Sequence, residues 1–179
     1  MGYIIGQILG ILSTVCTIVA PFFKKKWQLL CANIAANLLI SLNFILIGQI
    51  GSAAFLCMVA VVQSLVSMSH CTKGTKVTIA EAILFTVLYL AAGFYGIFSA
   101  PDFVLAINRQ NLLELMPIAG ALMLMVSVFT PDEQETRKWL LCNALIWTVY
   151  TAIVGSTVFF TDLVGVISTS TALYKYRKK

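Results

Sequence analysis

The feature that most constrains this chain is a succession of apolar stretches of similar length, separated by short polar connections. A hydrocarbon core about 30 Å thick needs roughly 20 apolar residues in a helix that crosses it. Seven stretches approach that length, at residues 3–22, 27–47, 52–69, 79–98, 112–130, 139–154 and 158–174. Charged residues make up only 11% of the chain, whereas soluble domains carry about 25%. The sequence therefore predicts an all-α membrane protein with seven transmembrane helices and no separate soluble domain.

The basic residues fall almost entirely on one side of the predicted membrane. With seven spans, the connections after the first, third and fifth spans lie on the same side as the C-terminus. These places hold every Lys and Arg except Arg109. Because positively charged connections stay in the cytoplasm, we expect the N-terminus outside and the C-terminus inside. The net charge of +5 is then a consequence of topology, and we expect the lipid bilayer, and no nucleic acid, as a partner.

A phrase that occurs twice indicates an internal repeat. Residues 26–33 read KWQLLCAN and residues 138–143 read KWLLCN. Aligning Asn33 with Asn143 gives an offset of 110 positions. The same offset pairs Gly10 with Gly120 and Pro21 with Pro131. A repeat at a fixed offset constrains the architecture of the whole chain.

The offset carries spans one, two and three onto spans five, six and seven. Equivalent spans are four apart in the order along the chain. Because four is an even number, the two copies run in the same direction across the membrane. The sequence therefore predicts a 3+1+3 arrangement of parallel triple-helix repeats. Residues 1–76 form the first repeat, 77–111 the linker helix and outer connection, and 112–179 the second repeat.

Three short motifs resemble a known family. LLELMPIAG (112–120), GQIGSAAF (48–55) and KWLLCNALIW (138–147) look like the YgjV-type family of small bacterial inner-membrane proteins. The predicted plan is similar to the SWEET, SemiSWEET and PQ-loop transporter superfamily, although the Pro-Gln dipeptide of that superfamily is absent here: Phe22 follows Pro21, and Ile118 follows Pro117. The resemblance implies location in the bacterial inner membrane and a translocation path between the two bundles that opens alternately to either side. It implies no particular substrate.

Polar residues inside the spans are the candidates for a binding site. Asn33, Asn37 and Ser41 are spaced by four on span two, so they form one polar stripe with about 40° between successive members. The repeat offset places Asn143, Trp147 and Thr151 on span six as their equivalents, with Tyr150 on the same face. Two interpretations remain open: the stripes line a solute pocket, or they hydrogen-bond neighbouring helices together in lipid.

Three carboxylates lie near span ends. Thr78 and Glu81 form a T-x-x-E capping box that starts span four. Glu114 follows Asn111 by three positions, so it either caps span five or lies at the outer mouth of a path. Asp162 is about five residues into span seven, with no capping residue three positions earlier, and an acid inside the membrane is by default a functional candidate. We leave open whether Asp162 contacts a solute or a proton, or is a carboxylate that reaches back to the interface.

Nothing in the sequence favours catalysis. His70 is the only histidine, and no Ser/His/Asp set, metal-ligand cluster or glycine-rich phosphate loop accompanies it. We therefore expect no enzymatic activity, no metal and no cofactor. The sequence favours a transporter for a small polar or amphipathic solute, with a non-transporting assembly or regulatory protein as the alternative. Self-association into a homo-oligomer is compatible with both. The predicted substrate-binding residues are Asn33, Asn37, Asn143, Trp147, Tyr150, Asp162 and Glu114.

Overall fold

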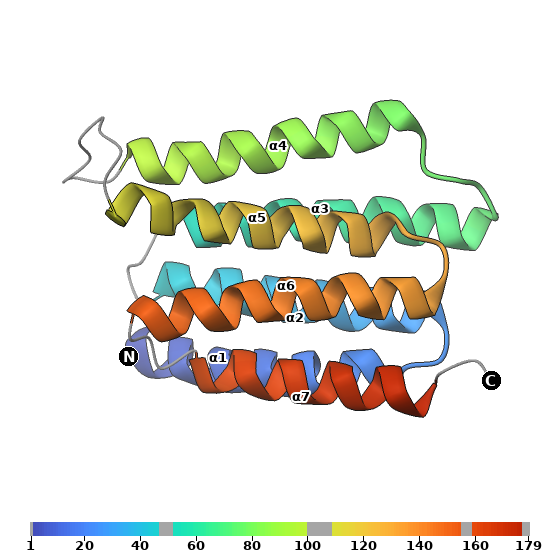
Figure 1. Cartoon of the computed structure of the whole chain (residues 1–179), viewed down its shortest axis with the longest axis horizontal. Helices are drawn as coiled ribbons and strands as arrows, with labels where there is room; N and C mark the ends of the chain where they lie inside the picture. The colour runs from blue at the N-terminus through green and yellow to red at the C-terminus, as the bar shows by residue number, and fades with distance from the viewer. Residues whose placement is uncertain (1, 47–51, 100–108, 155–158, 177–179) are drawn as a thin grey trace.

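The computed structural model describes residues 2–46, 52–99, 109–154 and 159–176. Within these residues the protein is all-helical, with seven α-helices and one short 3₁₀ turn (Figure 1). The helices are α1 (Gly2–Val19), α2 (Lys26–Leu46), α3 (Ser52–Lys73), α4 (Ile79–Phe98), α5 (Arg109–Phe129), α6 (Glu133–Val154) and α7 (Phe159–Lys175), and η1 covers Ala20–Phe22. They lie side by side along the long axis of the molecule (Figure 1).

Three helices are long and apolar enough to cross a membrane by length and composition alone: Ile4–Phe22, Ala53–Lys73 and Ile79–Phe98. A shorter apolar helix covers Leu115–Phe129. Each predicted span is thus represented by a helix in the described residues, and for three spans the apolar length is confirmed. Large apolar side chains such as Ile4, Ile11 and Ile79 are mostly exposed on the outside of the bundle, as expected where lipid replaces water as the solvent.

Two predicted loops are partly helical. α6 begins at Glu133, where a charged loop was predicted up to Lys138. The physical reason is Asp132, whose Oδ1 accepts hydrogen bonds from the backbone N–H groups of Gln134 at 2.9 Å and Glu135 at 3.1 Å. These bonds satisfy free donors of the first turn, so the helix starts early. The loop predicted from His70 likewise begins later, because α3 continues to Lys73.

The starts of α4 and α5 test two predicted helix caps, of which the cap of α4 is confirmed. The capping box of Thr78 and Glu81 is confirmed: Glu81 N–H donates to the Thr78 hydroxyl, and the Thr78 N–H donates to Glu81 Oε2 at 2.7 Å. α5, in contrast, begins at Arg109, so Asn111 lies inside the helix, and of the two interpretations left open for Glu114 the one in which it caps span five with Asn111 is wrong. Most of the predicted 103–110 connection lies outside the described residues.

The helices pack in an order that closes on itself. α1 packs on α2 and α2 on α3, while α5 packs on α6 and α6 on α7. α3 also packs on α5, and α1 on α7, so these six helices form a ring. α4 lies outside the ring against α3 and α5 (Figure 1). Exchanging α1 with α5, α2 with α6 and α3 with α7 leaves the order of contacts around the ring unchanged.

The best-packed region lies where α4 joins the ring. Its buried cluster contains Leu30, Leu56, Ala60, Tyr89, Ala121, Leu124 and Val128. Polar bonds run through the same region: Tyr89 Oη donates to Gln63 Oε1 at 2.8 Å, and Gln63 Nε2 donates to the Met125 carbonyl at 2.9 Å. Both side chains are fully buried. They link α3, α4 and α5, so hydrogen bonds as well as apolar contacts hold these three helices together.

Candidate functional site

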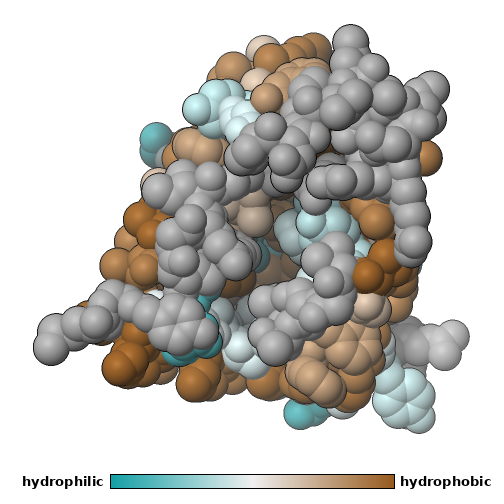
Figure 2. All heavy atoms as spheres, turned by 90° about the vertical axis from the view of Figure 1, so that its left-hand side faces the viewer, coloured by the Kyte–Doolittle hydropathy of each residue, from teal (hydrophilic) through white to brown (hydrophobic). Residues whose placement is uncertain are grey.

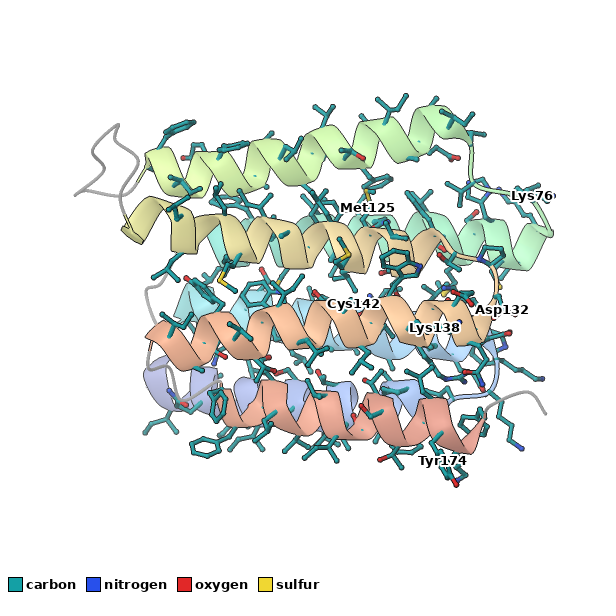
Figure 3. The ribbon with its side chains drawn as sticks, viewed as in Figure 1. Lys76, Met125, Asp132, Lys138, Cys142 and Tyr174 are labelled. Atoms are coloured by element: carbon teal, nitrogen blue, oxygen red, sulfur yellow. The ribbon has the colours of Figure 1, made fainter. Side chains whose placement is uncertain are left out.

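The end of the bundle that carries the basic connections is closed by a buried lysine. We call it the basic end; Lys76 and Lys138 mark it in Figure 3. Lys26, the first residue of α2, is only 8% exposed. Its ammonium donates to the Ser127 carbonyl of α5 at 2.9 Å and to Thr136 Oγ1 of α6 at 2.8 Å. Lys26 therefore ties the first half of the chain to the second.

A buried arginine makes the reverse connection. Arg137 of α6 is 2% exposed. Its Nε donates to the Pro21 carbonyl at 2.9 Å and its Nη2 to the Phe23 carbonyl at 2.7 Å. The guanidinium also lies over the Tyr176 ring, 4.8 Å from the ring centroid. We call Lys26 and Arg137, with the oxygens that they contact, the basic-end latch.

Burial lowers the pKa of both cations. Desolvation lowers the pKa of Lys26 to about 8, partly opposed by the nearby Cys71 and Glu133. Desolvation likewise lowers the pKa of Arg137, opposed by Glu133, Tyr176 and Asp132. In the described part of the chain neither side chain forms a salt bridge, so both depend on neutral oxygens. Buried cations without a carboxylate partner are costly, and they persist where a specific geometry needs them.

The latch was not predicted from the sequence. There, Lys26 counted only among the positive charges that set the topology, and nothing indicated that its side chain is buried. Trp27, beside it, is 45% exposed, as an interface anchor should be. One signal was available: Thr136 is separated from Lys26 by 110 positions, the repeat offset. Only the long-range packing shows that these two equivalents touch.

Figure 2 shows the opposite end of the bundle face on, with hydrophilic side chains visible among the apolar ones near its centre. In the described residues, no hydrogen bond of the kind seen in the latch joins α2 to α6 at this end. The buried cross-links of Lys26 and Arg137 lie at the basic end, whereas near the start of α7 the halves are joined by the hydroxyl groups of Thr14 and Thr161, 3.3 Å apart.

The α2 stripe makes contacts within its own half. Asn33 Nδ2 donates to Ser64 Oγ of α3 at 3.0 Å, and Ser41 Oγ donates to the Ala54 carbonyl at 3.3 Å. Asn37 is buried, and its Nδ2 donates back to the Asn33 carbonyl at 2.8 Å and to Asn33 Oδ1 at 3.1 Å. These bonds join α2 to α3, as the packing interpretation expects.

The α6 stripe is less satisfied. Asn143 Oδ1 is buried, and it is the buried side-chain polar atom that lacks a hydrogen-bond partner in the described structure. Trp147 lies beside it, against α5 at Gly120, where a Cβ would come 2.8 Å from the indole Nε1. The rings of Trp147 and Tyr150 meet edge to face, with centroids 5.9 Å apart. Gly120 thus allows an indole, an amide and a phenol to gather on one helix face.

Asp162 contacts Thr151, the member of that stripe nearest the C-terminal end of α6. Its Oδ2 lies 3.0 Å from Thr151 Oγ1, and the same hydroxyl lies 2.8 Å from the Trp147 carbonyl. One hydroxyl proton can serve only one of these acceptors at a time. An ionised Asp162 needs the Thr151 proton, whereas a protonated Asp162 donates its own and leaves Thr151 bonded to the carbonyl. The pair can therefore accommodate either charge state.

The structure does not gather all the predicted residues into one group. Asn143, Trp147, Tyr150 and Asp162 come from neighbouring positions on α6 and α7. No hydrogen bond in the described structure joins Asn33 or Asn37 to Asn143 or Trp147. Glu114 lies in α5, and its side chain is outside the described part of the chain. Within that part, no group of three or more His, Cys, Asp or Glu side chains could hold a metal ion.

Comparison with known proteins identifies the family. The model of the Imp-YgjV family, described as a bacterial inner membrane protein, matches residues 4–179. The chain belongs to this family. Neither the curated proteins nor the solved structures contain a significant match to it. This member of the Imp-YgjV family is therefore a helical protein of the bacterial inner membrane, and its activity has to be inferred from its own residues.

Proposed function

We propose that this protein is a membrane transporter that moves a small polar or amphipathic solute by alternating access between two triple-helix bundles. In this proposal α1–α3 and α5–α7 are parallel repeats and α4 is the linker, a 3+1+3 plan similar to that of SWEET and PQ-loop transporters. The identical contact pattern of the two halves supports this division. The basic end faces the cytoplasm, in keeping with the distribution of Lys and Arg.

The observation that carries the proposal is the difference between the two ends. The hydrogen bonds of Lys26 and Arg137 join the halves at the basic end, while hydrophilic side chains are visible near the centre of the opposite end (Figure 2). A protein that alternates needs a closure that can be broken. The latch consists of a few bonds to neutral oxygens at the bundle end, which a rigid-body movement of one half would release together.

The binding residues in this proposal are mainly on the second half. Asn143 offers an unsatisfied amide oxygen, Trp147 and Tyr150 offer aromatic surfaces, and Asp162 binds a solute cation or carries a coupled proton. A small number of placed polar groups beside aromatic surface is typical of small-molecule sites. Asn33 and Asn37 are the equivalents from the first half, and they complete the site when their bonds within α2 and α3 rearrange.

A second function is favoured by a specific observation. The Asn33–Ser64 and Ser41–Ala54 hydrogen bonds and the Gln63–Tyr89 pair all join neighbouring helices. If the polar stripes do only this, the protein is a non-transporting assembly or regulatory protein of the membrane. Such a protein would keep the latch closed permanently.

Uptake into proteoliposomes tests the transport proposal. The full chain is reconstituted and screened with labelled cationic, anionic and neutral solutes. We expect uptake of one class, reduced by about tenfold or more in Trp147→Ala and Asn37→Ala, because each variant loses direct contacts to the solute. Leu145→Ala is the matched control, since Leu145 is an exposed side chain on the same helix as Trp147. Absence of uptake for every class, or wild-type uptake by both variants, contradicts the proposal.

Accessibility of the latch gives a test that needs no solute. Ser127 is fully buried beside Lys26, so a single cysteine placed there, with the five native cysteines replaced, reports opening of the basic end. We expect slow labelling by a membrane-impermeant maleimide from that side, and much faster labelling when Arg137→Ala is added. A closed scaffold would show no labelling in the parent and no increase beyond that caused by general loss of stability.

A further inference from the structure

A cavity lies at the basic end, between α3 of the ring and α4, which packs outside the ring. It has a volume of about 540 Å³ and lies where the end of α3 meets the beginning of α4. Its lining residues are Val66, Ser69, His70, Lys73, Thr75, Lys76, Thr78 and Glu81. Because α4 packs outside the ring, this cavity is separate from the proposed transport path, and nothing in that path uses it.

The cavity has an excess of positive charge, because two lysines and one carboxylate, Glu81, line it. Glu81 already accepts from the Thr78 N–H at 2.7 Å and contacts His70 Nε2 at 2.8 Å. The ammonium groups of Lys73 and Lys76 form no hydrogen bond or ion pair with any described residue, and both side chains are exposed. The two ammonium groups are therefore available to an anionic ligand, while the Glu81 carboxylate is engaged at the start of α4.

The walls are held in place by local bonds. His70 Nδ1 lies 2.7 Å from Thr75 Oγ1, so the imidazole bridges the connection after α3 and the first turn of α4. Gly74 makes that connection possible with a φ of +66°, a left-handed conformation that favours glycine. The two lysines flank this turn at Lys73 and Lys76. The turn thus sets the separation of the two lysines along the backbone.

Exposed apolar side chains lie on the same two helices, α3 and α4. Leu65 precedes the lining residue Val66 in sequence, Ile79 follows Thr78, and Ile83 lies two positions after Glu81. These three side chains are 46%, 80% and 59% exposed, respectively. In a protein of the inner membrane, such surfaces at a helix end contact the upper parts of acyl chains. A ligand here contacts lysine ammonium groups at the polar surface of the bilayer and apolar side chains nearer its hydrocarbon core.

We propose that this cavity binds the headgroup of an anionic phospholipid, with the phosphate between Lys73 and Lys76 and the acyl chains along Leu65, Ile79 and Ile83. A basic cavity between membrane helices, level with the polar surface of the bilayer, has the charge and the shape that such a headgroup requires. We commit to a phospholipid and not a free anion because exposed apolar residues of the same two helices, close in sequence to the lining residues, lie in a protein of the inner membrane. The proposal does not depend on transport.

Thermal unfolding of the purified full chain tests the proposal. In a zwitterionic detergent, phosphatidylglycerol should raise the melting temperature of the wild type by roughly 5 °C at saturation, because a ligand that binds the folded state stabilises it. Phosphatidylcholine should have no such effect. The shift should be lost in Lys73→Gln/Lys76→Gln, and each single variant should lose part of it. Native mass spectrometry should show phosphatidylglycerol retained by the wild type and released from the double variant.

A matched control separates the cavity from the general charge of this end. Lys24→Gln/Lys25→Gln removes two exposed lysines at the same end and should keep the full shift. If this control loses as much of the shift as the cavity variant, or if the cavity variant keeps it, the proposal is overturned. An equal shift with inorganic phosphate alone also overturns it, since a small-anion site would then suffice. Because both cavity lysines are exposed, the variants should melt like wild type without lipid.

Discussion

Lys26 Nζ lies 2.8 Å from Thr136 Oγ1, and these two residues are separated by the 110 positions of the internal repeat. Equivalent positions of the two halves thus meet each other at the basic end. In a two-fold arrangement only residues near the axis can touch their own equivalents. In the proposed 3+1+3 repeat, the latch therefore lies on the axis between the halves, which is where the proposed path has to open.

The lowered pKa of Lys26 predicts that stability rises with pH. The pKa is about 8 in the folded protein, against 10.5 for an ordinary lysine, so between these values the unfolded state binds one more proton. The free energy of unfolding then increases with pH across this window, by up to about 3 kcal/mol. Melting curves from pH 7 to 10 should show this rise in the wild type and in Lys25→Met, and a flatter profile in Lys26→Met. Equal slopes in all three would refute the assignment.

Removal of the Arg137 guanidinium should destabilise the protein. Arg137→Ala leaves the Pro21 and Phe23 carbonyls without their donor, at a cost of about 3 kcal/mol, since bonds from charged groups contribute more than neutral ones. Arg137→Lys should cost less, because one cation can still reach one carbonyl. Lys138→Ala is the control: Lys138 is exposed and pairs with Glu135 at the surface, where a salt bridge contributes little. Thermal or denaturant unfolding in detergent measures all three variants.

The contact of Trp147 with α5 predicts a clash at Gly120. In Gly120→Ala the new Cβ would lie 2.8 Å from the indole Nε1 and 3.0 Å from Cδ1, so Trp147 must move. We expect a loss of about 1–3 kcal/mol and, if Trp147 binds the solute, weaker uptake. Replacing Trp147 by Leu in the same protein should recover stability but not uptake. Stability that stays low in the double variant would show that the strain lies elsewhere.

The attachment of α4 depends on Gly93. An added Cβ would lie 2.4 Å from Cγ1 of Ile118 on α5, a distance that packed atoms do not adopt. Gly93→Ala should therefore destabilise the protein strongly, and Ile118→Ala should leave a cavity of its own. The double variant fills that space, so its loss should be smaller than the sum of the two single losses. Additive losses, measured by unfolding in detergent, would contradict the close contact between Gly93 of α4 and Ile118 of α5.

The buried Tyr89–Gln63 pair should make a modest contribution. Tyr89→Phe leaves Gln63 Oε1 without a donor, and hydrogen bonds between helices in lipid contribute about 0.6 kcal/mol on average. We expect a loss of about 1 kcal/mol and unchanged uptake, because the pair packs α3 on α4 and lies outside the proposed binding group. A Tyr89→Phe variant with wild-type stability but altered uptake would instead give the pair a functional role.

The helices could be predicted from the sequence because each reflects a local property. A run of about 20 apolar residues has to bond its backbone internally in lipid, so spans one, three and four follow from composition alone. The Thr78–Glu81 capping box follows from a four-residue motif. The start of α6 was missed because the cap at Asp132 lies within a charged segment, where hydrophobicity alone indicates a loop.

The candidate site was predicted only in part. The stripe containing Asn143 and Trp147 follows from helical spacing, yet its partner Gly120 and the unsatisfied amide oxygen depend on how α5 packs against α6. The stripe containing Asn33 looks the same in sequence but bonds to α3. Spacing shows which side chains share a face, and it does not show which neighbour that face meets.

The sequence by itself determined the class of protein and the approximate extent of its helices, because hydrophobic length and local capping are properties of short segments, and it predicts the repeat that the proposed function uses. Only the tertiary structure decided that Lys26 and Arg137 are buried between those halves. Their acceptors lie more than 100 residues away along the chain, and a charge in a short connection looks like a solvated residue until the packing of two distant helices removes it from water.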